Sequence, residues 1–272
     1  MSNQVLHPKT LEEHRQYLYD IVRLKLFFLH LYLTEKEPGA DFSHTIRQKV
    51  DIYRKTEANP GPHTPTELFF DAPAWKNMED EAKRIFKSYG TNSDSARQKF
   101  EDEAFLVFKD SIDLRCERDF LDNSVLEKYQ CGSLKHEYAV NEDGWLGFHM
   151  ANAVRPHSFY DDPLYLPRCF RALLRVAEVK YHAKEIFTHS WLNDTKRWQA
   201  QFPAVWMENM SEASENVNWT YGWWGQFISA RGVLQKKNAD YLREHHDFPC
   251  KPRLSHCPVN LMKEHIFNIL GE

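Results

Sequence analysis

Residues 134–154, LKHEYAVNEDGWLGFHMANAV, decide the fold class of this 272-residue chain. Two runs rich in aromatic and aliphatic residues, Leu134–Val140 and Trp145–Val154, flank the tetrapeptide Asn141-Glu142-Asp143-Gly144. Runs of this composition favour strands, and a four-residue connection that ends in glycine is typical of a hairpin. The stretch therefore predicts a β-hairpin, which is the first β structure along the chain.

Upstream of this hairpin the sequence predicts helices. Thr10 and Glu13 form a capping box in front of apolar residues at helical spacing, and Pro38-Gly39 ends that first helix. Few β-branched residues occur in this half. Further helices are predicted over about residues 41–56, 73–89 and 93–121. The range 1–130 is therefore predicted to be a helical domain, built as a bundle.

Downstream of the hairpin, helix and strand patterns alternate. Asp162-Pro163 caps a helix that runs to about His182, and Glu185–Leu192 (EIFTHSWL) has the composition of a strand. Further helices are predicted over about 195–207, 233–245 and 258–270, and another strand over Asn218–Ile228. The range 131–272 is therefore predicted to be an α+β domain with a small mixed sheet covered by helices. The fold class of the whole chain is α+β.

Composition and charge restrict the partners and the location that we expect. The net charge is −4 and the pI is about 6.4, so no field of one sign attracts nucleic acid or an anionic membrane. The most apolar run, Leu24–Leu33, is about half the length of a membrane span and contains Lys25 and His30. The first ten residues lack an apolar signal core, and five scattered cysteines suit reduced thiols. We expect a cytoplasmic protein that binds neither nucleic acid nor membranes.

Several familiar catalytic motifs are absent from the sequence. There is no GxxxxGK[ST] phosphate loop, no GxGxxG after a strand, no GxSxG elbow and no HExxH helix. Nucleotide hydrolysis, a Rossmann cofactor site and the α/β-hydrolase mechanism therefore lose support. The unusual features of the composition are 14% aromatic residues and 14 histidines.

Histidines on the predicted strands are candidates for acid–base chemistry, because the histidine pKa lies near neutrality. His149 lies in the second arm of the hairpin, opposite the region of His136 and Glu137. If residues 185–193 are extended, alternate residues of that segment share one polar and aromatic face that would line a cleft. The predicted catalytic residues are His149, His189 and Glu185, and the predicted substrate-binding residues on the same strand are Trp191 and Asn193. A structural histidine bonded to backbone is the alternative at both histidine positions.

The densest aromatic cluster follows the polar segment SEASENVN (residues 211–218), which is placed where a lid would lie. On the predicted strand Asn218–Ile228, the side chains of Trp219, Tyr221 and Trp223 face one way. Such a row stacks on a sugar ring, a base or another planar substrate. Tyr221 and Trp223 are therefore further candidates for substrate binding, and packing in the core is the alternative.

Two groups of residues raise the alternative of a metal site. His182, Glu185 and His189 have a spacing that would suit one face of a helix, but the predicted strand separates them. A second group with zinc-ligand chemistry occupies a proline-rich turn near the C-terminus and matches no standard zinc-finger spacing. Its members are His245, His246, Cys250, His256 and Cys257. Zinc or iron remains an alternative, but no residue is assigned as a metal ligand.

Two short motifs resemble a known superfamily. Leu146–Met150 (LGFHM) and Ile186–Leu192 (IFTHSWL), with a helix between them, are similar to the C-terminal part of GNAT-type acyltransferase-like proteins that carry a helical N-terminal domain. Those proteins have an HIP-like strand and a CxSWLL-like strand. The resemblance covers at most Leu146 to Gln226 and implies a helical bundle followed by a β-α-β-α order. The glycine-rich turn that binds acyl-CoA in true GNAT enzymes is missing here, and no catalytic residue is carried over.

These observations lead to three functional hypotheses. The first is a small-molecule enzyme, an acyl- or group-transferase that uses histidine acid–base chemistry, with acyl-CoA as the cofactor to test. The second is a metal-dependent enzyme with histidine and glutamate ligands. The third is a non-catalytic ligand-binding or interaction protein with an aromatic-lined cleft. The sequence leaves the cofactor, the substrate and the oligomeric state undetermined.

Overall fold

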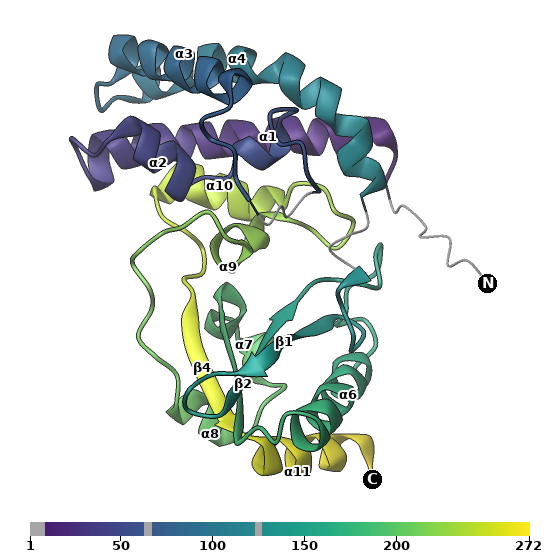
Figure 1. Ribbon diagram of the computed structural model, residues 1–272. Helices are drawn as coiled ribbons and strands as arrows, with labels where there is room; N and C mark the ends of the chain where they lie inside the picture. The colour runs from purple at the N-terminus through teal and green to yellow at the C-terminus, as the bar shows by residue number, and fades with distance from the viewer. Residues whose placement is uncertain (1–8, 63–66, 123–126) are drawn as a thin grey trace. The chain divides into compact units, whose positions relative to one another are not determined.

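The computed structural model describes residues 9–62, 67–122 and 127–272, which form two compact units (Figure 1). Unit 1 joins residues 1–124 with the segments 217–220 and 227–249. Unit 2 joins residues 125–216 with the segments 221–226 and 250–272. The sequence prediction put all of 131–272 into one domain, whereas two segments of that range make their contacts within unit 1.

Unit 1 consists mainly of helices. The capping box that begins its first helix is confirmed, since the Thr10 hydroxyl accepts from the backbone of Glu13 and the Glu13 carboxylate accepts from the backbone of Thr10. The second helix is shorter than the predicted range 41–56. The elements are α1 (Leu11–Leu31), the π-helical turn η1 (Tyr32–Lys36), α2 (Phe42–Gln48), the 3-10 turn η2 (Tyr53–Lys55), α3 (Pro73–Tyr89), α4 (Asp94–Leu121) and α10 (Lys236–His245).

The core of unit 1 forms where α1 and α3 pack along α4. Leu18 and Phe28 of α1, Trp75 of α3 and Phe100 and Phe108 of α4 are almost completely buried there. The apolar run that contains Lys25 and His30 thus lies inside protein, as predicted. In the described ranges no helix has both the length and the apolar character that a membrane crossing requires.

Unit 1 also buries a group of charged side chains. Arg54 donates two hydrogen bonds to the carboxylate of Asp51, at 2.7 and 2.8 Å, and Lys25 donates to the backbone carbonyl of Asp51 at 2.9 Å. Burial lowers the pKa of Lys25 to about 7, although Asp51 partly opposes that shift. Burial alone would raise the pKa of Asp51, but the neighbouring Arg54 and Lys25 hold it well below its usual range. The Arg54 guanidinium lies 4.2 Å from the ring centre of Trp219.

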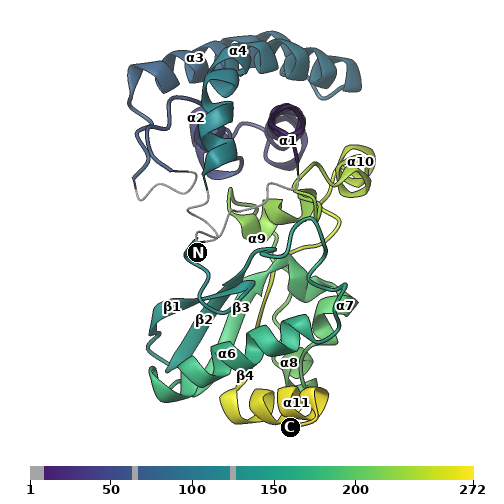
Figure 2. The same cartoon turned by 90° about the vertical axis from the view of Figure 1, so that its right-hand side faces the viewer.

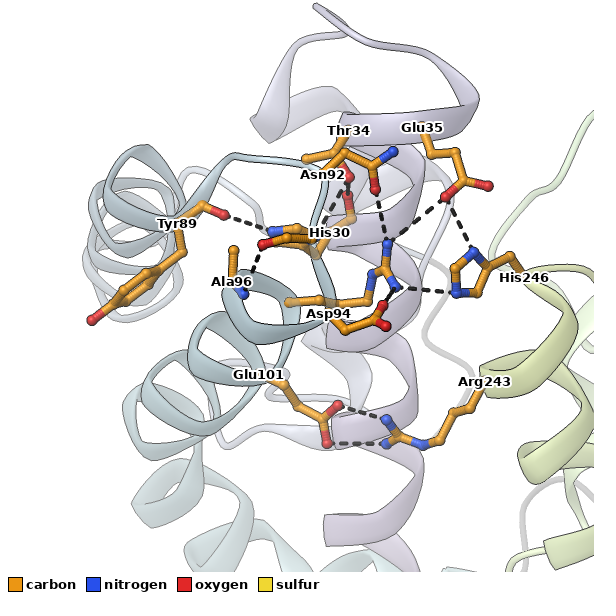
Figure 3. A network of polar contacts seen from close by, with 12 residues as sticks. His30, Thr34, Glu35, Tyr89, Asn92, Asp94, Ala96, Glu101, Arg243 and His246 are labelled. Carbon is orange, nitrogen blue, oxygen red and sulfur yellow. Dashed lines mark hydrogen bonds and ion pairs between the residues drawn. The ribbon is translucent and has the colours of Figure 1, made fainter.

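A network of polar contacts holds α10 to the N-terminal helices within unit 1 (Figure 3). The buried guanidinium of Arg97 contacts His246 Nε2 at 3.1 Å, and His246 Nδ1 lies 3.1 Å from a carboxylate oxygen of Glu35. A guanidinium only donates, so Nε2 of His246 accepts and its Nδ1–H donates to Glu35. One turn away, Arg243 donates two hydrogen bonds to the buried Glu101, at 2.8 and 3.0 Å.

Unit 2 contains a four-stranded sheet in the order β1-β2-β3-β4. The neighbours pair antiparallel, parallel and antiparallel in turn, so the sheet is mixed as predicted. Helix α6 connects the two parallel strands and lies in front of the sheet in Figure 2. The elements are β1 (Leu134–Val140), β2 (Trp145–Met150), α6 (Tyr165–Val179), β3 (Glu185–Ser190), the 3-10 turn η3 (Trp191–Asp194), α7 (Lys196–Gln199), α8 (Ala204–Glu208), α9 (Tyr221–Trp224), followed by the 3-10 turn η4 (Gly225–Phe227), β4 (Arg253–Pro258) and α11 (Val259–Leu270). The α+β fold class is confirmed.

The predicted hairpin is present, and its connection is fixed by Asn141. The side-chain oxygen of Asn141 accepts from the backbone N–H of Asp143 at 3.2 Å and from that of Trp145 at 2.8 Å. Gly144 has a φ of +83°, a conformation that glycine adopts without the steric cost of a Cβ. The side chain and the glycine together fix the turn next to the pair Val140 and Leu146, and the register of β1 against β2 shifts between Val140 and His136.

Two predictions of local structure in unit 2 are wrong. The aromatic segment 218–228 forms α9 and a 3-10 turn, not a strand. Trp223 and Trp224 are adjacent in this segment and both are buried. A helical turn permits this, but a strand with a single buried face does not. The second difference is β4, which occupies part of the range predicted to be a turn.

One face of the sheet forms the core of unit 2. Phe148 of β2 packs against Phe170 of α6 and against Trp198 and Trp206 of the small helices. Phe202 stacks on Trp206 with ring centres 3.9 Å apart. The buried strand residues on this face include Leu134, Leu146, Phe148, Ile186 and Cys257. Helices α6, α7, α8 and α11 thus cover this face of the sheet.

The outer edge of β4 is paired with the polar segment that the sequence placed as a lid. The backbone N–H of Ser211 donates to the carbonyl of Leu254 at 2.9 Å, and that of Ser214 donates to the carbonyl of Pro252 at 2.8 Å. The Ser211 hydroxyl also accepts from the backbone of Leu254. These bonds place the start of the segment along the sheet edge.

Candidate functional site

The sheet face opposite the core carries the predicted catalytic residues of unit 2, and we call it the open face. Strand alternation and the observed registers put side chains from all four strands on it. They are partly or fully exposed, with the exception of Gly147. The open face consists of Lys135 and Glu137 on β1, Trp145, Gly147 and His149 on β2, Glu185, Phe187 and His189 on β3, and Leu254 and His256 on β4.

The first histidine–carboxylate pair on the open face joins β2 to β1. His149 Nε2 is hydrogen-bonded to a carboxylate oxygen of Glu137. Both side chains are about half exposed, at 55% for His149 and 45% for Glu137. The bond orients the imidazole and leaves its other nitrogen, Nδ1, on the side away from Glu137. A carboxylate in this position also stabilises the imidazolium that forms when the ring takes up a proton.

The second pair joins β3 to β4. His256 Nδ1 is hydrogen-bonded to a carboxylate oxygen of Glu185. On the other side, the ring of His256 stacks on Trp145, with ring centres 4.1 Å apart and an interplanar angle of 20°. Phe187 lies 6.1 Å from Trp145, measured between ring centres. Glu185 therefore anchors an aromatic group and is bonded to a different histidine from the predicted catalytic ones.

His189 lies on the same face as His149. Gly147 on β2 is paired with Phe187 on β3 in a parallel register. Continued by two residues along both strands, this register places His149 beside His189. Neighbouring atoms partly desolvate the His189 ring and lower its pKa. This shift favours the neutral form of the ring, which is the form that accepts a proton.

Gly147 allows the neighbouring side chains to lie close over the centre of the open face. A Cβ at this position would be 3.1 Å from Glu137 Cγ and 3.1 Å from the ζ carbon of Phe187. Real Cβ atoms rarely have contacts this short, so any larger residue here would displace one of these groups. The geometry of the Glu137–His149 pair thus depends on a glycine.

Trp191 and Asn193 do not continue the face of β3, so that part of the prediction is wrong. The strand ends at Ser190, whose hydroxyl accepts from the backbone of Leu192, and the chain turns into η3. Asn193 is fully buried, and its side chain donates to the carbonyls of Thr188 at 3.0 Å and Arg253 at 2.8 Å. Its side-chain oxygen accepts from Trp198 Nε1 at 2.9 Å. These bonds give Asn193 a structural role.

Tyr221 and Trp223 also do not belong to a strand, so that part of the prediction is wrong. Both belong to α9, whereas the prediction placed them on a strand. Trp223 is 1% exposed and belongs to the core, whereas Tyr221 is partly exposed. The row of aromatic rings expected on one strand face is therefore absent from this described segment.

The proposed metal-ligand groups do not converge. His256 lies on the open face of β4 and the adjacent Cys257 on its buried face, while His246 takes part in the network of unit 1. His182 precedes β3 in a left-handed conformation, with a φ of +47°. Among the described residues, no three potential ligands from His, Cys, Asp and Glu lie close enough to hold a metal ion.

Sequence reasoning missed two aromatic members of the open face, Trp145 and His256. Alternation along the predicted strand placed Phe187 on the same face as Glu185 and His189, and the structure confirms this. His256 was grouped with the cysteines because β4 was not recognised. The alternation of Ser255 and Cys257 inward with Leu254 and His256 outward was the available signal.

In comparisons with known proteins, no family model, no curated protein and no solved structure matches this chain. No residue role is therefore transferred from another protein. The chemistry of the open face rests on the two histidine–carboxylate pairs, on His189 and on the aromatic rings of Trp145 and Phe187.

Proposed function

We propose that this protein is an enzyme acting on a small molecule, and that His149 exchanges protons with the substrate on the open face. The observation that carries the proposal is the hydrogen bond between His149 Nε2 and Glu137 at an exposed position. A base held by a carboxylate partner, with its second nitrogen free to face a ligand, is the arrangement that general acid–base catalysis uses. The position of His189 on the neighbouring strand supports a second contact with the reacting group.

The reaction class that best uses these groups is group transfer to a hydroxyl or an amine. In such a transfer the acceptor oxygen or nitrogen attacks the carbonyl carbon of an acyl donor while His149 takes the acceptor's proton. The bond from that carbon to the leaving group then breaks, and the protonated His149 returns the proton to the leaving group. For a thioester donor such as an acyl-CoA, the leaving group is a thiol. Glu137 stabilises the charged imidazole between the two proton transfers.

An assay of thiol release tests this proposal. The intact protein is incubated with a panel of acyl-CoA donors and small amine or hydroxyl acceptors, and the free thiol is measured with a chromogenic thiol reagent. We expect one donor–acceptor pair to be turned over and His149→Gln to reduce the rate by about 100-fold or more. Because His149 is exposed, the melting temperature of the His149→Gln variant should stay within a few degrees of the wild-type value.

The matched control is His157→Gln, which removes an exposed histidine of unit 2 that lies outside the open face. This variant should keep the wild-type rate. A rate that falls equally in both variants, or that survives His149→Gln unchanged, contradicts the proposed role of His149. The absence of thiol release with every donor contradicts the acyl-transfer part of the proposal.

A second candidate function is the binding of a planar ligand without turnover. The stacked rings of Trp145 and His256, with Phe187 beside them, favour it, because flat ligands gain from offset stacking on aromatic rings. In this case panel compounds raise the melting temperature of the wild type but produce no thiol. Trp145→Ala abolishes that increase, and His149→Gln retains it.

A further inference from the structure

Helix α4 carries apolar side chains on two opposite sides. One side packs into the core of unit 1 with Phe100, Phe108 and Ile112. On the other side Leu106, Leu114 and Leu121 are 66%, 73% and 59% exposed. Isolated exposed leucines are common on protein surfaces. These three share a side, since a rotation of 100° per residue places them within an arc of about 80°.

Acidic residues lie between the leucines on the same side of the helix. Asp110 and Glu117 fall inside the same arc and are exposed. Within the described part of the chain, neither carboxylate has a hydrogen bond or an ion pair. Glu103 lies within the same arc about one turn before Leu106, and it accepts a hydrogen bond from the Tyr89 hydroxyl. We call this set the leucine–acid stripe; its residues are Glu103, Leu106, Asp110, Leu114, Glu117 and Leu121.

Two cations of α4 beside the stripe bond to acids outside it, and Lys99 lies on the same side of the helix one turn before Glu103. Lys109 pairs with Asp113, and Arg118 pairs with Glu57. The stripe therefore combines three exposed leucines with acidic side chains, two of which have no partner, and extends about 27 Å along the helix axis. Its apolar spacing of seven and eight residues is that of a helix surface which packs against another helix.

We propose that the leucine–acid stripe binds a basic amphipathic helix of another protein. Leucine-type anchors on the partner would fit between Leu106, Leu114 and Leu121, and lysine or arginine would pair with Asp110 and Glu117. Charge complementarity favours a basic partner over a second copy of this chain, because Asp110 and Glu117 would meet their own equivalents when two copies of α4 pack in parallel. The stripe is remote in sequence from the open face, and the inference is independent of the proposed function.

A designed peptide tests the inference with the full-length protein. The probe is a fluorescein-labelled helical peptide of about 20 residues with leucine at heptad a and d positions and lysine at the flanking positions. Its partner probe has glutamate in place of every lysine. Fluorescence anisotropy should show binding of the lysine peptide, weakening as salt rises, and at least about tenfold weaker binding of the glutamate peptide.

Variants of the stripe distinguish specific binding from general attraction to an acidic protein. Leu114→Gln should weaken binding of the lysine peptide by about tenfold, since a leucine buried on binding contributes that much affinity. The double change Asp110→Asn with Glu117→Gln should weaken binding and reduce its salt dependence. Val179→Gln, at an equally exposed apolar residue on α6, is the control and should leave binding unchanged.

Three results would overturn the proposal. The first is equal binding of the lysine and glutamate peptides, or no binding of either. The second is wild-type binding by Leu114→Gln with its fold intact by circular dichroism. The third is self-association of the wild type in sedimentation velocity that Leu114→Gln abolishes, since the stripe would then hold a second copy of the chain.

Discussion

Trp145 and His256 stack on each other although β3 lies between their strands. Trp145 is paired with Glu185, and His256 with Phe187, so the tryptophan ring reaches diagonally across β3 to the imidazole. The contact joins β2 to β4 on the open face of the sheet. It therefore adds side-chain coupling between strands that share no backbone hydrogen bonds.

A double-mutant cycle measures this coupling. Trp145→Ala and His256→Ala, made singly and together, should show an interaction energy of about 0.5–1.5 kcal/mol in the free energy of unfolding, as aromatic pairs do. Urea denaturation followed by circular dichroism provides the values. The control cycle combines Trp145→Ala with His189→Ala, which lies at the other end of β3, and should be additive within about 0.5 kcal/mol. Equal coupling in both cycles would show that the stack contributes nothing specific.

Gly147→Ala should disturb the open face more than the fold. The added Cβ meets Glu137 and Phe187 at 3.1 Å, so one of these side chains must move. We expect a loss of about 1–2 kcal/mol in unfolding free energy, together with a weaker Glu137–His149 contact. The His149 ring resonances in a proton–carbon NMR spectrum report that contact. Gly39→Ala adds a Cβ that meets nothing within 4 Å at a φ of +92°, so any loss there comes from backbone strain, whereas the loss at Gly147 comes from close packing.

Asn193→Asp should destabilise unit 2 strongly, although the two side chains have nearly the same shape. A carboxylate cannot donate to the carbonyls of Thr188 and Arg253, and its charge would be buried. We expect a loss of about 2–4 kcal/mol at pH 7. Asn268→Asp, at an exposed position on α11, should change the stability by less than about 0.5 kcal/mol. If the two variants are equally stable, Asn193 is not the structural link described above.

Lys25 should make the stability of unit 1 depend on pH. Its folded pKa of about 7 lies below the unfolded value of about 10.4, so between these values the unfolded chain holds more protons than the folded chain. The free energy of unfolding contributed by this residue therefore rises with pH. The stability difference between wild type and Lys25→Met should grow by about 1–2 kcal/mol in favour of the wild type from pH 7 to pH 8.5.

The measurement for Lys25 is urea denaturation of both proteins at the two pH values. Comparing the two proteins cancels the titration of the cysteines, which both proteins share. Lys236→Met removes an exposed lysine as a control and should show no such change. A difference that stays constant between pH 7 and pH 8.5 would mean that Lys25 keeps its proton in the folded state.

The parts of the fold that were predicted have local causes. The Asn141–Gly144 connection forms through a side chain and a glycine that belong to the turn itself. The capping box of α1 likewise lies within four residues. In such places the sequence contains both partners of each contact, so pattern reasoning is enough.

The parts that were missed depend on distant residues. Strand β4 is held by pairing with β3 and by the segment from Ser211 to Ser214, and neither partner is adjacent to it in sequence. Asn193 was predicted to lie on the substrate-binding face of β3, because no residue near it in the sequence indicates that its side chain bonds to the carbonyl of Arg253. The open face was predicted in part, because some of its features have local causes and others depend on distant residues. Its histidines on β2 and β3 were predicted, but their arrangement beside Trp145 and His256 depends on the sheet order.

The network that joins Arg97 to His246 has a consequence for synthesis on the ribosome. Arg97 and Glu101 are buried against residues 246 and 243, which are translated almost 150 residues later. When the first 124 residues have emerged, these side chains lack their contacts with α10 and have only nearer partners, such as Asp94 for Arg97 and Arg23 for Glu101. Unit 1 therefore reaches its final packing only after the chain of unit 2 up to residue 226 has been made.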